Sequence, residues 1–250
     1  MESIHISLRA ETIGHVFGLP ITNSLVLSLL TAVLLVGGGF FIARTLKPVP
    51  GKAQSTAELA VGGILDFMAQ VLGDRQQALK FFPLVATIFL FILLNNWMGV
   101  LPGIGSMGTV DEVHGFVPFL RPAAADLNTT LALAIIAVLA VQLYAVQKLG
   151  FFAQVGKYIN FRQGPLHFFV GLLELLGEFA RVLSFSFRLF GNMFAGEVLL
   201  IIMMALLPLI ASFGALPFFF LEYFVGFIQA LVFAMLTLVF LKVATMEVEH

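Results

Sequence analysis

Several residue types are missing or scarce in this sequence. Cysteine is absent from all 250 residues, which excludes disulfide bonds, thiol catalysis and cysteine-ligated metal. Charged residues make up 11%, whereas about one quarter is usual in a soluble domain. A net charge of −1 gives no electrostatic basis for binding nucleic acid. Segments of about ten residues with alternating hydrophobicity, typical of a membrane β-barrel, are also missing.

Apolar residues dominate what is present. They make up 60% of the chain, and the mean hydropathy is +1.04. This composition, with 28 Phe suited to face lipid, predicts an all-α polytopic membrane protein with about five membrane-embedded helices and one interfacial helix. Without internal repeats or linkers, residues 1–250 form a single membrane domain. Residues 1–20 precede the first span, and the first 15 of them are polar and mixed in charge, unlike a signal or transit peptide.

Hydropathy divides the first part of the chain into helices. Residues 21–43, 81–101 and 127–146 each approach the ~20 apolar residues that a bilayer requires, and they are predicted to span it. Between the first two spans, apolar residues follow one side of a helical wheel and polar residues the other. This pattern predicts an interfacial helix at 55–77.

The last part of the chain contains two longer apolar segments, Gly164 to about Ser212 and Gly214 to Met246. They predict a long, tilted helical hairpin over 164–246. The first segment is much longer than a bilayer is thick, so we expect it to be strongly tilted or broken, with Pro208 as a candidate end.

The distribution of cations orients the chain, because Lys and Arg accumulate on the cytoplasmic side of membranes. It predicts an outside N-terminus, an outside loop at 102–126 and a cytoplasmic C-terminus. The cytoplasmic set comprises Arg44, Lys47, Lys52, Arg75, Lys80, Lys148, Lys157 and Arg162, and the outer set comprises Arg9 and Arg121.

Arg188 is a cation at membrane depth, with no other cation between Arg181 and Lys242. An arginine keeps its proton in proteins, so this position carries a fixed positive charge. Because a central Arg costs roughly 2.5–3.5 kcal/mol on insertion scales, such residues usually mark an ion or proton path. The alternative is a structural ion pair between Arg188 and Glu197 or Glu222.

Polar residues of the hairpin fall on distinct helical faces. On an ideal helix, one stripe about 80° wide contains several of them, and Glu197 points roughly 100° away from it. A second face, in the following helix, includes Glu222, Gly226 and Gln229. The first stripe comprises Glu174, Glu178, Arg181, Arg188 and Asn192. Solvated interfacial charges are an equally good interpretation of Glu174 and Glu178.

Other polar residues lie near span ends. Asn95, Asn96, Asp126 and Asn128 suit either a polar route or simple helix capping. No pair of histidines has zinc-ligand spacing, and the glycines at 103–108 do not open a phosphate-binding helix. The sequence therefore predicts no metal site, no cofactor and no nucleotide bound by this chain.

Four segments together resemble the a subunit of F-type ATP synthases, the stator half of the proton channel. The most specific is RLFGNMFAGE at 188–197. The others are NWMGVLP at 96–102, AADLNTTLALA at 124–134 and FIQALVFAMLTLVFL at 227–241. The resemblance covers most of residues 60–247.

The resemblance implies roles for particular residues. Arg188 would be the essential stator arginine, and Asn192 its neighbour one turn on. Glu222 stands where some family members have His, which leaves the details of the proton relay open. The outer half-channel would be lined by Glu197, Glu222, Gln229, Asn96 and Asp126, and the inner one by Ser184, Asn192, Glu174 and Glu178.

The resemblance also implies partners and a mechanism. The last two helices would curve around a ring of c subunits, and the complex would include peripheral-stalk b subunits and other ATP synthase subunits in the lipid bilayer. A ring carboxylate passing Arg188 would release its proton and take up another beyond it. The chain itself would be non-catalytic and would lie in a bacterial plasma membrane, with the mitochondrial inner membrane as the lesser alternative.

Two other classes of protein fit parts of this pattern. A proton-coupled secondary transporter would also place charges at mid-membrane, but it commonly shows repeats and broken helices that are not found here. An intramembrane enzyme would need an activated nucleophile, and Ser184 and Ser186 have no nearby His base in the sequence. Proton and sodium coupling both stay open, because the ion ligands would lie largely on the rotor.

Overall fold

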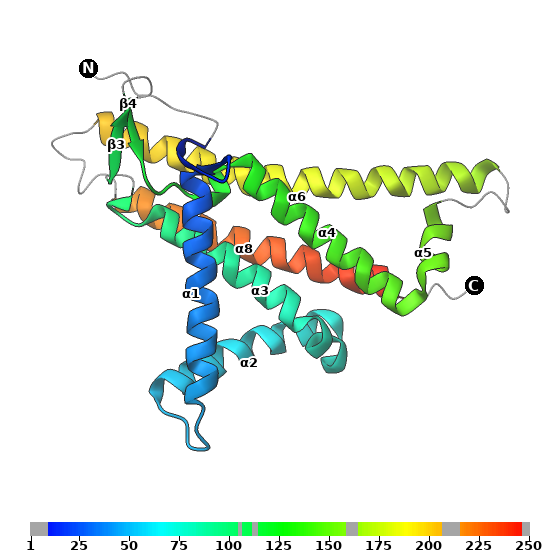
Figure 1. The fold of residues 1–250 in the computed structure, drawn as a ribbon. Coiled ribbons are helices and arrows are strands. Elements are labelled where there is room, and N and C mark those ends of the chain that lie inside the picture. Colours follow the sequence, from blue (N-terminus) through cyan, green and yellow to red (C-terminus); the bar gives the residue numbers. More distant parts are fainter. Residues whose placement is uncertain (1–9, 105–106, 112–114, 159–164, 207–215, 247–250) are drawn as a thin grey trace.

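The computed structural model describes residues 10–104, 107–111, 115–158, 165–206 and 216–246 (Figure 1). Within these ranges the chain is mostly helical, and five helices are long and apolar enough to cross a membrane. They confirm the predicted class of an all-α polytopic membrane protein. The five are α1 (Asn23–Thr45), α2 (Lys52–Leu72), α3 (Arg75–Val100), α4 (Leu127–Leu149) and α8 (Leu216–Thr245).

Local capping chemistry separates α2 from α3. α2 ends at Gly73, whose φ of 76° lies in the left-handed region that glycine adopts readily. The side chain of Asp74 then accepts a hydrogen bond from the Gln76 backbone N–H at 2.8 Å. α3 therefore begins at Arg75, before the apolar run that predicted a span from residue 81.

α2 leaves the lower end of α1 at a steep angle instead of running alongside it (Figure 1). Such a course suits a helix lying along a membrane surface. α2 is nevertheless long and apolar enough to cross a bilayer, so its interfacial location stays a prediction.

The last two helices are the longest elements. α6 (Pro165–Leu206) is an unbroken helix of 42 residues, and α8 has 30. At 1.5 Å per residue α6 is about 63 Å long, roughly twice the hydrocarbon thickness of a bilayer. Of the two expectations for this segment, a break is excluded over 165–206, and a strong tilt in the membrane stays a prediction. Pro208 lies outside the described residues.

The core lies where α3, α4, α6 and α8 cross. Phe233 of α8 is 2% exposed, and its ring centroid lies 4.7 Å from that of Phe185 in α6. A second cluster joins α2 and α3 to α4 and α8, with the Phe81 and Tyr144 rings packed edge to face at 5.4 Å. Large apolar side chains also cover the outer surfaces of the helices, as expected for contact with lipid.

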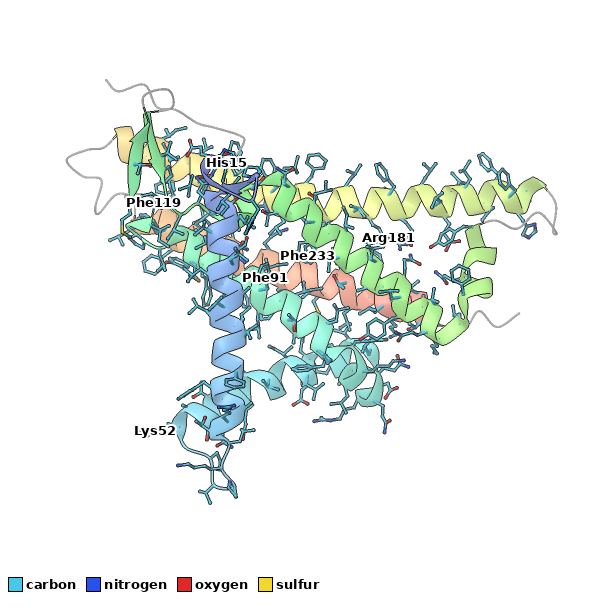
Figure 2. The ribbon with its side chains drawn as sticks, viewed as in Figure 1. His15, Lys52, Phe91, Phe119, Arg181 and Phe233 are labelled. Atoms are coloured by element: carbon cyan, nitrogen blue, oxygen red, sulfur yellow. The ribbon has the colours of Figure 1, made fainter. Side chains whose placement is uncertain are left out.

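Two short β-hairpins were not predicted. One pairs β1 (Thr12–Val16) with β2 (Leu19–Thr22), and the other pairs β3 (Gly108–Asp111) with β4 (Gly115–Pro118). The Asn23 side chain links them by donating to the Pro118 carbonyl oxygen at 3.3 Å. Figure 2 places His15 and Phe119, from this hairpin region, at one end of α1 and Lys52 at the other.

Short elements connect the remaining helices. The 3-10 helix η2 (Ala123–Ala125) is fully buried and leads into α4. α4 stops at Gly150, whose φ is 89°, and α5 (Phe151–Tyr158) then packs against α4 and α6. η2 and α5 thus hold the two ends of α4 against α6.

Candidate functional site

Arg188 lies on the exposed face of α6, near the middle of the helix. Its Nη2 atom donates to Ser184 Oγ, one turn earlier, at 3.3 Å. None of the ion pairs found in the described ranges includes Arg188. Exposed small or polar residues surround it on this face, namely Ser184, Gly191, Asn192 and Ala195. The guanidinium is therefore open to a partner approaching from outside the bundle.

The alternative interpretation, an ion pair of Arg188 with Glu197 or Glu222, is wrong. No such pair forms among the described residues. Glu197 pairs with a different cation, Arg121. Glu222 is buried, and in the part of the chain that the structure describes its Oε1 atom has no hydrogen-bond partner. Neither acid therefore compensates the charge of Arg188.

The Arg121–Glu197 pair joins the segment after β4 to α6. Arg121 Nε donates to Glu197 Oε1 at 2.9 Å and to Oε2 at 3.1 Å, and Nη2 donates to Oε2 at 2.9 Å. The two side chains are only 6% and 18% exposed. Sequence reasoning used Arg121 only to orient the chain. The signal missed in the sequence was that Arg121 is an isolated cation in an apolar segment on the outer side of the membrane, where cations are rare.

Polar side chains from α3, α6 and α8 meet beside the Arg188 face. Asn192 Nδ2 donates to Gln229 Oε1 at 2.9 Å, and Asn96 Nδ2 donates to the Gly226 carbonyl oxygen at 3.1 Å. Three buried atoms here have no partner among the described residues: Asn96 Oδ1, Glu222 Oε1 and Gln229 Nε2. Since buried polar atoms are usually satisfied by protein or by water, this cluster is suited to bind water between the helices.

Two glycines create the room for this cluster. A Cβ atom at Gly196 would lie 1.9 Å from Glu222 Oε2, so the carboxylate occupies space that only glycine leaves open. A Cβ atom at Gly226 would lie 3.0 Å from Asn96 Cβ. Gly196, the glycine before Glu197 in RLFGNMFAGE, therefore leaves room for the carboxylate of Glu222 on the neighbouring helix.

Asp126 lies apart from this cluster and caps α4, which confirms the capping interpretation. Its Oδ1 atom accepts from the Asn128 backbone N–H at 3.0 Å. Its Oδ2 atom accepts from Ser24 Oγ at 2.8 Å, in a site where Ser24 is fully buried. Asp126 therefore anchors the start of α4 to α1.

Glu174 and Glu178 lie towards the other end of α6. Glu178 pairs with Arg181 one turn on, whose guanidinium lies 4.4 Å from the centre of the Phe240 ring. Glu174 is exposed. The Tyr158 phenol donates to Gln142 Oε1 at 3.2 Å. Burial raises the pKa of this phenol, and the negative charges of Glu178 and Glu174 raise it further. In Figure 2, Arg181 lies on α6 far from the end of that helix that is near the β-hairpins.

The fold and this site define a multi-pass helical membrane protein with a polar cluster inside the bundle and one accessible cation beside it. A family model described as "ATP synthase A chain" matches residues 25–242. The chain therefore belongs to the ATP synthase A chain family, which confirms the resemblance drawn from the four sequence segments.

Curated relatives agree with this assignment. One is the "ATP synthase subunit a" of Syntrophobacter fumaroxidans, which is 35% identical over 223 residues, covering 87% of this chain and 81% of the relative. That of Geobacter sulfurreducens is 32% identical over 254 residues, covering 100% and 94%. That of Desulfotalea psychrophila is 38% identical over 203 residues, covering 80% and 75%.

Proposed function

We propose that the chain is the proton-translocating stator subunit of a rotary F-type ATP synthase. The observation that carries this proposal is Arg188, an exposed cation on α6 with no acidic partner in the described part of the chain. A cation left open on a membrane helix is costly, and a passing negative group would offset that cost. The chain itself is non-catalytic and binds no nucleotide.

The mechanism is electrostatic. When a rotor carboxylate approaches Arg188, the fixed positive charge stabilises its ionised form and favours release of its proton. Beyond Arg188 the carboxylate enters lipid, where it must be protonated to stay neutral. Arg188 also blocks direct proton flow between the two half-channels. A potential of 100 mV contributes ~2.3 kcal/mol per proton, so rotation pools several protons for each synthesis step.

Two groups of residues form the half-channels in this proposal. The outer one follows the α3–α6–α8 cluster, and the partnerless buried atoms of Asn96, Glu222 and Gln229 support a watery route there. Glu197 belongs to its wall, whereas Asp126 anchors the start of α4 beyond the cluster. The inner half-channel runs from Ser184 and Asn192 towards the other end of α6, where it is lined by the acids Glu174 and Glu178.

The exposed face of α6 supports the proposed assembly. The small residues around Arg188 let the helices of a c-subunit ring approach closely, and peripheral-stalk b subunits and other subunits complete the complex. The chain lies in a bacterial plasma membrane with its N-terminus outside and its C-terminus in the cytoplasm. In this arrangement α2 lies at the cytoplasmic interface.

Purification tests this assignment against that of a self-sufficient transporter. The chain, extracted in mild detergent from its own membranes, should co-purify with a small carboxylate-bearing protein in many copies. On its own in vesicles, it should catalyse no coupled transport. Coupled solute and proton uptake by the purified chain alone would refute the proposal.

A further inference from the structure

A second polar cluster lies under α5, far from the β-hairpins, where α5 packs against α4 and α6 (Figure 1). This α5 cluster comprises Gln142, Gln154, Tyr158 and Glu178. Gln154 Nε2 donates to Gln142 Oε1 of α4 at 2.7 Å, and the Tyr158 phenol donates to the same oxygen at 3.2 Å. Gln154 is only 5% exposed, although it belongs to a short connecting helix.

Two buried oxygen atoms of the α5 cluster have no hydrogen-bond partner among the described residues. They are Gln154 Oε1 and Glu178 Oε2. Glu178 is close enough for its charge to act on the Tyr158 phenol, and its other oxygen accepts from Arg181. Both partnerless atoms are acceptors, so they cannot satisfy each other, whereas water offers two O–H donors. Buried polar atoms of this kind are usually satisfied by ordered water.

A simpler interpretation is that the two glutamines only fasten α5 to α4. Their hydrogen bond would be sufficient for that purpose. It leaves unexplained why Gln154 Oε1 and Glu178 Oε2 are both buried without a donor, because an unsatisfied buried acceptor costs stability. An apolar pair would fasten the helices without this cost. The partnerless oxygens therefore favour a site that binds water.

The α5 cluster also lies on the inner side of the proposed proton route. Glu178 belongs to the polar stripe of α6 that includes Arg188 and Asn192. Gln154 is buried, whereas Tyr158 is half-buried and lies at the boundary between the cluster and the surface. The cluster therefore joins an acid of the stripe to the surface on the side predicted to be cytoplasmic.

We infer, on the basis of the proposed function, that the α5 cluster binds water and is the cytoplasmic exit of the inner half-channel. The water donates to Gln154 Oε1 and Glu178 Oε2. A proton released by the rotor carboxylate joins this water to give hydronium, which the negative charge of Glu178 stabilises. The proton then passes to cytoplasmic water beside Tyr158, and a neutral water stays in the site. Glu178 keeps its charge and its pair with Arg181 throughout.

Replacing the glutamines without losing the contact between the helices tests this inference. Gln142→Leu/Gln154→Leu substitutes an apolar pair of similar size, which is often nearly neutral for stability. In the whole complex it should keep the ring bound and reduce ATP-driven pumping in inverted vesicles about fivefold or more, since one hydrogen bond contributes roughly that factor. Gln147→Leu is the matched control, because Gln147 is an exposed glutamine of α4, and it should pump like the parent. Parental pumping in the assembled double variant would overturn the inference.

A thiol probe keeps the inference testable if the double variant does not assemble. The chain has no native cysteine, so the treated parent complex controls for thiols on other subunits. In Gln154→Cys, a small cationic methanethiosulfonate reagent added to inverted vesicles should reach the thiol through water. The treated variant should then show a loss of pumping that the treated parent does not show. Full pumping after treatment would overturn the inference.

Arg188→Ala, measured in the same vesicles, separates this inference from the proposed function. If Arg188→Ala is inactive while the double variant or the treated Gln154→Cys complex pumps like the parent, the exit under α5 is refuted and the proposed function stands. Coupled pumping in Arg188→Ala would refute the proposed function itself.

Discussion

Arg121 and Arg188 show how differently one side chain is used in the same molecule. Arg121 is 6% exposed and is bound by the carboxylate of Glu197, whereas Arg188 lies on the exposed face of α6 and donates to the neutral Ser184 hydroxyl. A paired, buried cation fixes local structure. A cation without an acidic partner in the described part of its own chain is available to a partner that carries the opposite charge.

Gly196→Ala should disable the outer polar cluster while leaving α6 intact. The new Cβ atom would lie 1.9 Å from Glu222 Oε2, so the carboxylate must move out of its place. Overpacking of this kind costs about 1–3 kcal/mol, and we expect ATP-driven pumping to fall about tenfold or more. Gly177→Ala is the matched control, because nothing lies within 4 Å of a Cβ atom there. Equal pumping in both variants would contradict the placement of Glu222.

Sequence patterns predicted some of these residues and missed others for a clear physical reason. Arg188, Asn192 and Gln229 stood out because polar side chains in apolar helices are rare. The partner of Glu197 was missed because Arg121 is 76 residues away, in a segment between helices. Helical periodicity relates residues three or four apart, so it carries no information on such a contact.

The same limits apply to helices and strands. Apolar runs predicted the spans, but capping by Asp74 moved the start of α3 back to Arg75. The two hairpins have strands of only four or five residues, too short for their alternation to be distinguished from loop sequence. The unbroken course of α6 was one of two expectations that length alone allowed.

The start of α4 offers a test of the role of Asp126. Asp126→Asn keeps a side-chain oxygen for the Asn128 N–H, and its amide N–H can donate to the Ser24 hydroxyl oxygen, so this variant should keep most activity. Asp126→Ala loses both contacts, which should cost about 1–2 kcal/mol and lower the melting temperature of the complex. Thermal unfolding and ATP-driven pumping measure the two effects. If Asp126→Asn assembled normally but abolished pumping, Asp126 would be a proton carrier.

For the molecule as a whole, the predicted orientation is testable because the chain has no native cysteine. His15→Cys and Lys52→Cys place single thiols in exposed positions at opposite ends of α1 (Figure 2). A membrane-impermeant maleimide should label His15→Cys in intact spheroplasts and Lys52→Cys only in inverted vesicles, since cations accumulate on the cytoplasmic side. The reverse pattern would place the N-terminus in the cytoplasm.

The central claim is that a fixed charge at Arg188 couples proton flow to rotation. Its most direct test is proton flux and ATP synthesis in vesicles carrying Arg188→Ala, with assembly checked by co-purification of the ring. Arg44→Ala is the control, because Arg44 is an exposed cation at the end of α1. We predict that Arg188→Ala assembles normally and loses ATP synthesis, while Arg44→Ala retains it. Coupled synthesis in an assembled Arg188→Ala complex would contradict the account.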